Sequence, residues 1–215
     1  MKTLKIIRIL FILGSFTACK KDKVDTPEPA QEPFAITDYV LVEKGLGVDD
    51  NDHLITTFEL QGKAIWYTLL GYLEGPKYTF EDGVLKIYLG GTVEREFKIE
   101  NQKIVSHSVK FQPYSCQLVK ISKSNVLDGN TYNGGWRNEG SLIVSVSKLK
   151  FTDTHYAEAS LNLPVPNNEY KSLKNIGAYS RINNVNTLWI LINGKLEGSR
   201  KYESGNIAIG DFNKQ

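Results

Sequence analysis

Residues 82–102 read DGVLKIYLGGTVEREFKIENQ, and their pattern indicates the fold class. Apolar and polar side chains alternate through Val84–Leu89 and again through Val93–Ile99, which is the period of a β-strand with one buried face. The pair Gly90-Gly91 separates the two runs, and glycine pairs are typical of tight hairpin turns. This stretch therefore predicts a β-hairpin.

The same two-residue period dominates the chain after residue 33. Further strand-like runs are Leu54–Leu60, Leu142–Phe151, His155–Leu163, Ala178–Ile182 and Leu188–Ile192. No stretch has the period of an amphipathic helix, although residues 168–175 are compatible with one short helical turn. Many short strands with glycine-rich turns predict an all-β protein, either an up-and-down barrel fold or a β-sandwich. Polar turn residues at 123–125 divide it into 34–124 and 125–215, and a single β domain over 34–215 is the alternative.

The N-terminus has the pattern of an export signal. Basic residues at positions 2 and 5 precede an apolar run at 6–16, which is too short to span a bilayer. The run ends in Phe16-Thr17-Ala18-Cys19, which resembles the lipobox of bacterial lipoproteins. The resemblance implies that residues 1–18 are a signal peptide and that Cys19 becomes the mature N-terminus, carrying acyl chains such as palmitate.

Residues 19–33 are expected to form a flexible tether, because they contain charges and prolines and almost nothing to bury. Proline spacing favours extended backbone, which would hold a domain away from the membrane. Lys20 stands where an aspartate retains some lipoproteins in the inner membrane. Resemblance to outer-membrane lipoproteins of the Bacteroidota type therefore implies a lipid-anchored envelope protein in the outer membrane, in its periplasmic or its surface leaflet.

The second half of the chain resembles the small lipocalin-like barrel domains of bacterial lipoproteins. The resemblance rests on Leu127–Tyr132, Gly134-Gly135-Trp136, Gly177–Tyr179 and Ile192–Lys195. In lipocalins a Gly-x-Trp on the first strand places a tryptophan at one barrel end, and Trp136 is expected to take that place. Glycines and polar residues flank Trp136, so an exposed ring is also expected. We therefore predict Trp136 and Tyr132 as ligand-binding residues.

Residues that commonly carry chemistry are present without the spacing that chemistry requires. Cys116, the only cysteine in the body of the chain, lies in a strand-like run, which indicates a buried and unreactive thiol. His53, His107 and His155 stand alone, without the neighbours of a zinc site. No nucleophile elbow or phosphate-binding loop occurs. We expect no enzyme, no cofactor and no metal.

Two charged stretches are interpreted as solvated surface. Residues 49–52, DDND, are read as an acidic turn because the glycine and spaced glutamate of a calcium loop are absent. Glu94 and Glu96, with Arg95 and Lys98 nearby, are read as an ordinary solvated strand face. The formal net charge of the whole chain is +2, which gives no basic surface for nucleic acid.

These observations predict a membrane-anchored, non-enzymatic lipoprotein. It is expected to bind a small apolar or glycan ligand, or a protein partner, at the cell envelope. The alternative is a structural or assembly component of an envelope complex that takes no small-molecule ligand. The aromatic side chains favour binding, because rings on a β surface stack on sugars or line apolar pockets.

Overall fold

The computed structural model describes residues 34–45, 53–109 and 115–215. The predicted signal peptide, the acylated Cys19, the tether and the acidic turn at 49–52 lie outside these ranges. Within them, the only helical elements are the short 3-10 turns η1 (Ile36–Asp38) and η2 (Leu60–Gly62). No helix in this part of the chain is long and apolar enough to cross a membrane.

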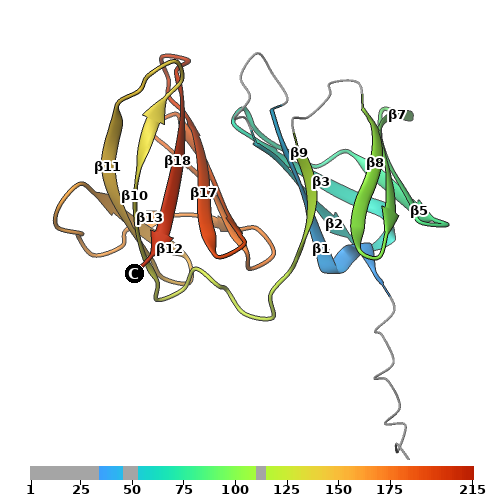
Figure 1. Cartoon of the computed structure of the whole chain (residues 1–215), viewed down its shortest axis with the longest axis horizontal. Helices are drawn as coiled ribbons and strands as arrows, with labels where there is room; N and C mark the ends of the chain where they lie inside the picture. The colour runs from blue at the N-terminus through green and yellow to red at the C-terminus, as the bar shows by residue number, and fades with distance from the viewer. Residues whose placement is uncertain (1–33, 46–52, 110–114) are drawn as a thin grey trace, which may run out of the picture. The chain divides into compact units, whose positions relative to one another are not determined.

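The first sheet is antiparallel and has nine strands. They are β1 (Tyr39–Lys44), β2 (His53–Glu59), β3 (Lys63–Thr68), β4 (Gly71–Leu73), β5 (Lys77–Glu81), β6 (Val84–Leu89), β7 (Thr92–Glu100), β8 (Lys103–Val109) and β9 (Ser115–Lys120). Their order is β8-β7-β6-β5-β3-β2-β1-β9, with β4 beside β3. The edge strands β8 and β9 contact each other, so the sheet curves into a nearly closed barrel (Figure 1).

The second sheet is also antiparallel with nine strands, in the order β13-β12-β11-β10-β18-β17-β16-β15-β14. They are β10 (Thr131–Asn138), β11 (Val144–Phe151), β12 (His155–Ala159), β13 (Asn168–Glu169), β14 (Lys171–Ser172), β15 (Gly177–Ile182), β16 (Val185–Ile192), β17 (Lys195–Lys201) and β18 (Ile207–Lys214). Strand β13 approaches β15, which nearly closes this sheet too. The predicted all-β, barrel-type fold is confirmed, whereas the helical turn expected at 168–175 is replaced by two short strands.

The chain passes from the first sheet to the second between Lys120 and Thr131. Residues 34–215 together form one compact unit. The predicted division into domains 34–124 and 125–215 stays a prediction, as does the alternative of one domain. Figure 1 shows the strands of the first sheet in blue to green and those of the second in yellow to red.

Strand alternation distributes the apolar side chains over three cores. The interior of the first barrel includes Leu41, Phe58, Leu85, Ile87 and Phe97. The interior of the second includes Tyr132, Trp136, Phe151, Trp189 and Phe212. A third cluster joins the sheets through Val40, Val42, Ile55, Leu188 and Ile190. Strand β1 thus buries both faces, which accounts for the unbroken apolar sequence Tyr39–Val42.

Candidate functional site

A buried carboxylate lies on the inner face of the first barrel. Glu43 follows Leu41 by two residues on β1, and because Leu41 packs in the inner core, alternation turns Glu43 inward as well. Glu43 pairs across the sheet with Leu54 and Cys116, and it is fully buried. A carboxylate in an apolar barrel is costly unless it finds a charged or hydrogen-bonding partner.

Arg95 supplies the charge that faces Glu43. It lies on β7 two residues before the core residue Phe97, and its Nε atom is 3.4 Å from Glu43 Oε2. The guanidinium carbon lies 5.2 Å from the centroid of the Trp66 ring, which is a cation–π distance. Glu43, Arg95 and Trp66 therefore form one cluster, although they come from β1, β7 and β3.

The polar atoms of this cluster lack hydrogen-bond partners within the described part of the chain. These atoms are the two carboxylate oxygens of Glu43, Nε of Arg95 and Nε1 of Trp66. On the same sheet, Thr56 Oγ1 and His107 Nδ1 also lack a hydrogen-bond partner. Each unsatisfied buried polar group costs roughly 1–3 kcal/mol. Their concentration in one barrel indicates a place where a bound molecule, solvent or ligand, completes the hydrogen bonds.

Burial governs the protonation of this cluster. It raises the pKa of Glu43 from 4.5 to about 7, and the positive charge of Arg95 acts in the opposite direction. Burial, followed by the negative charge of Glu43, raises the pKa of the Cys116 thiol to about 11. Cys116 is a free cysteine, and at neutral pH it stays an unreactive thiol.

A cavity of about 350 Å³ opens beside Arg95 and Trp66, and we name it the Arg95 pocket. Its lining consists of His53, Leu54, Trp66, Thr68, Leu69, Leu70, Arg95, Lys201 and Ile207. The cavity has the size of a small-molecule site, about 300–1,000 Å³. Its two strong charges, Arg95 and Lys201, are both positive, and among the described residues no carboxylate lines it.

The second barrel holds a similar trio whose hydrogen bonds are complete. Arg200 donates to both oxygens of Glu158, from Nη1 at 3.2 Å and Nη2 at 2.5 Å, and lies 4.1 Å from the Trp136 ring centroid. Trp136 Nε1 and Ser147 Oγ donate to Glu158 Oε1 at 2.6 and 2.8 Å. Burial acts to raise the pKa of Glu158, but the bonds and charge of Arg200 and these two donors lower it overall. Glu158, Arg200 and Trp136 therefore form a structural network in which the side-chain hydrogen bonds are satisfied internally.

The predicted ligand-binding residues Trp136 and Tyr132 lie in this second core. Trp136 is 4% exposed, so the expectation of an exposed ring is wrong. The reason is that Gly198 and Gly210 leave room for the ring: an added Cβ at either position would lie 2.8 Å from it. Tyr132 is fully buried against Phe151, and burial raises its pKa to about 12. A ligand-binding role for either residue stays a prediction.

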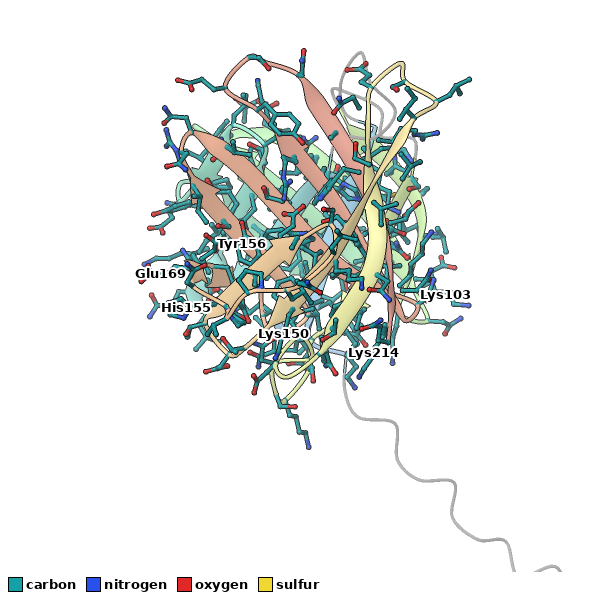
Figure 2. All side chains as sticks on the ribbon, turned by 90° about the vertical axis from the view of Figure 1, so that its left-hand side faces the viewer. Lys103, Lys150, His155, Tyr156, Glu169 and Lys214 are labelled. Atoms are coloured by element: carbon teal, nitrogen blue, oxygen red, sulfur yellow. The ribbon has the colours of Figure 1, made fainter. Side chains whose placement is uncertain are left out.

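The histidines lie in separate environments. His53 Nδ1 is 3.1 Å from Ser199 Oγ, and its Nε2 is 3.5 Å from Glu197 Oε2. Figure 2 shows His155 beside Glu169, its partner across β12 and β13, with 3.9 Å between Nε2 and Oε1. Among the residues that the structure describes, no three potential ligands of a metal ion come together.

Sequence reasoning missed Glu43 and Arg95. Glu94 and Glu96 are partly exposed, in line with the solvated face expected for them, whereas alternation directs Arg95, named only as a nearby charge, inward. Glu96 does face solvent, where it pairs with Lys86 at 3.4 Å. The signal that could have found the cluster is a charge in phase with apolar residues, as in Arg95-x-Phe97-x-Ile99.

No family model matches this chain, and neither a curated protein nor a solved structure matches it significantly.

Proposed function

We propose that this protein binds a small, predominantly apolar molecule in the Arg95 pocket and is held at the outer membrane through an acylated Cys19. The observation that carries the proposal is the position of buried, unsatisfied polar atoms of Arg95, Trp66 and Glu43 beside a largely apolar cavity of about 350 Å³. Apolar walls with a few convergent polar groups are typical of ligand sites.

The one group of side chains in the described ranges that resembles a catalytic triad supports binding without catalysis. Ser199, His53 and Glu197 resemble a serine, base and acid arrangement in their distances. However, Ser199 is fully buried, so its hydroxyl offers no room for a substrate carbonyl. Lys44 also forms an ion pair with Glu197, which ties this contact into the packing between the sheets. The group is better explained as a structural contact.

The second candidate function is an assembly role, and an exposed apolar strip favours it. The strip consists of Leu142, Ile143, Val144 and Val146, all exposed, just before and at the start of β11. Strand β12 pairs with β11 only from Lys148 onward, so residues 144–147 keep one free edge. Free edges and apolar patches are common docking surfaces for partner chains.

Isothermal titration calorimetry with decanol tests the binding proposal. The full chain carrying Cys19→Ser is used, because this change removes the predicted acylation site. We expect saturable binding with one decanol per chain. Leu70→Asp places a charge on the apolar lining of the Arg95 pocket and is expected to weaken binding by at least about tenfold.

The control is Leu60→Asp, because Leu60 and Leu70 are both 78% exposed in connections between strands of the first sheet, while only Leu70 lines the pocket. Equal affinities in the two variants would place decanol elsewhere and contradict the proposal. Absence of saturable binding in the parent chain would favour the assembly role.

A further inference from the structure

The side-chain N–H groups of Arg95 lack hydrogen-bond acceptors within the described residues, whereas those of Arg200 have them. Arg200 donates from Nε to Thr187 Oγ1 at 3.1 Å and from both Nη atoms to Glu158. No side-chain N–H group of Arg95 donates to an acceptor within the described residues, and its only ion-pair contact there is the 3.4 Å approach to Glu43. The two arginine side chains are buried to a similar degree, and each lies over a tryptophan ring. They differ in that, in the described part of the chain, only Arg200 has oxygen atoms that accept its hydrogen bonds.

An arginine with unused N–H groups beside an apolar cavity suits one class of ligand head group. The planar guanidinium offers parallel donors that match the two oxygens of a carboxylate. Lys201 adds a second positive charge to the lining, while Glu43 is fully buried and does not line the cavity. The field in the pocket therefore favours an anion over a cation.

We propose that the ligand of the Arg95 pocket is an organic monocarboxylate with an apolar body, and that its carboxylate replaces Glu43 as the partner of Arg95 while Glu43 takes up one proton from solvent. This inference rests on the proposed function of the pocket and names its ligand class. The balance is one anion and one proton bound together, so the charge of the buried cluster is unchanged. Protonated Glu43 becomes a hydrogen-bond donor, which also satisfies a group that lacks a partner.

The groups around Glu43 support this exchange. Arg95 faces it from β7, while Cys116 on β9 and Leu54 on β2 lie opposite it in the sheet and carry no compensating charge. The adjacent Lys44 is engaged with Glu197. Burial already holds the pKa of Glu43 at about 7, with Arg95 as the charge that lowers it, so an anion that neutralises Arg95 raises this pKa further.

The test compares decanoate with decanol, which share a chain and differ in the head group, by calorimetry on the full chain with Cys19→Ser. Titrations at about pH 8, in buffers of different ionisation enthalpy, give the number of protons taken up. We expect decanoate to bind at least about tenfold more tightly than decanol, with uptake of close to one proton. Its affinity should fall by up to about tenfold per pH unit above pH 7, and that of decanol should not.

Three variants separate the steps. Arg95→Gln should abolish the preference for decanoate and leave decanol binding, while Arg181→Gln, which removes an exposed arginine of the second barrel, should change neither. Glu43→Gln should retain decanoate binding but lose the proton uptake and the pH dependence. This variant keeps the inference testable if Arg95→Gln does not fold.

The outcomes distinguish the two proposals. Decanol binding with no preference for decanoate, or a preference that survives Arg95→Gln, overturns the carboxylate inference and leaves the pocket a site for apolar molecules. Tight decanoate binding without proton uptake overturns the role of Glu43. If neither compound binds, the proposed function fails, and the inference fails with it.

Discussion

Glu43 and Arg95 face each other inside the first barrel with 3.4 Å between Oε2 and Nε, yet no hydrogen bond joins them. In the second barrel, Arg200 and Glu158 form a bidentate pair, to which Trp136 adds its own hydrogen bond. Both barrels thus bring together a glutamate, an arginine and a tryptophan. Only the second barrel satisfies them internally, which separates a structural network from a candidate binding site.

The saturated network predicts a large loss of stability when Glu158 is removed. Glu158→Ala would leave the charge of Arg200 without its carboxylate partner and would deprive Trp136 and Ser147 of their acceptor. We expect the free energy of unfolding to fall by about 3–5 kcal/mol, measured by urea denaturation. Glu96→Ala is the control, because its pair with Lys86 is exposed; it should cost less than about 1 kcal/mol. Similar losses in both variants would contradict the structural role.

The unsatisfied cluster predicts an unusual dependence of stability on pH. Because the folded pKa of Glu43, about 7, lies above the ordinary value of 4.5, the folded state binds more protons between these values. The contribution of Glu43 is therefore fully present below pH 4.5 and is lost as the pH rises through 7. The loss amounts to about 3 kcal/mol, from the size of the pKa shift.

Urea denaturation of the parent chain and of Glu43→Gln, at intervals from about pH 5 to pH 8, measures this loss. Glutamine does not titrate, so the variant should show a flatter profile over this range. Glu197, whose pKa is lowered to about 2 by hydrogen bonds and charges from His53 and Lys44 despite burial, loses its contribution only in stronger acid. Parallel profiles for the two proteins would show that Glu43 titrates normally.

The glycines beneath Trp136 predict a steric effect. A Cβ at Gly198 would lie 2.8 Å from Cη2 of Trp136 and 3.1 Å from Trp189, in a core that cannot shift freely. Gly198→Ala is therefore expected to lower the free energy of unfolding by about 1–3 kcal/mol. Gly75→Ala is the matched control, since its nearest contact would be an ordinary 4.0 Å. Denaturation curves that coincide for both variants would contradict this packing.

Much of the fold could be predicted from the sequence because the β period is local. The hairpin of β6 and β7 follows from alternation and the glycine pair at 90–91, and the pairing of Val84 with Lys98 confirms it. The second-barrel core was harder to predict. Trp136 has glycine and polar neighbours in sequence, but its burial depends on Gly198 and Gly210, more than sixty positions away.

The candidate site could not be predicted for a related reason. Charges on strands are mostly solvated, and only the combination of three strands brings Glu43, Arg95 and Trp66 together. Alternation could have placed each one on the inner face. Their mutual contact depends on how β7 curves around to meet β1, and no local pattern in the sequence records that curvature.

The predicted lipid anchor has a direct test at Cys19. Expressed in a bacterium that acylates lipoproteins, the chain should lose residues 1–18 and carry the mass of its acyl chains on Cys19, measured by intact-mass spectrometry of the membrane fraction. Cys19→Ser should abolish this added mass, because serine offers no thiol for the acyl-bearing thioether. Cys116→Ser is the control and should leave the anchor unchanged. An unacylated N-terminus in the parent chain would contradict the lipobox interpretation.

The exposed strip on β11 predicts association through a strand edge. Residues 141–147, SLIVSVS, contain no charge and no proline, so the features that usually protect a free edge are absent. We expect the sedimentation coefficient of the full chain with Cys19→Ser to rise with concentration, and Val146→Lys to reduce this rise, because a lysine on the edge opposes close pairing. Leu161→Lys, which changes another exposed apolar residue that lies outside any strand, should leave the rise in place. If both lysines act alike, general charge rather than the edge would account for the effect, and the assembly role would lose its structural basis.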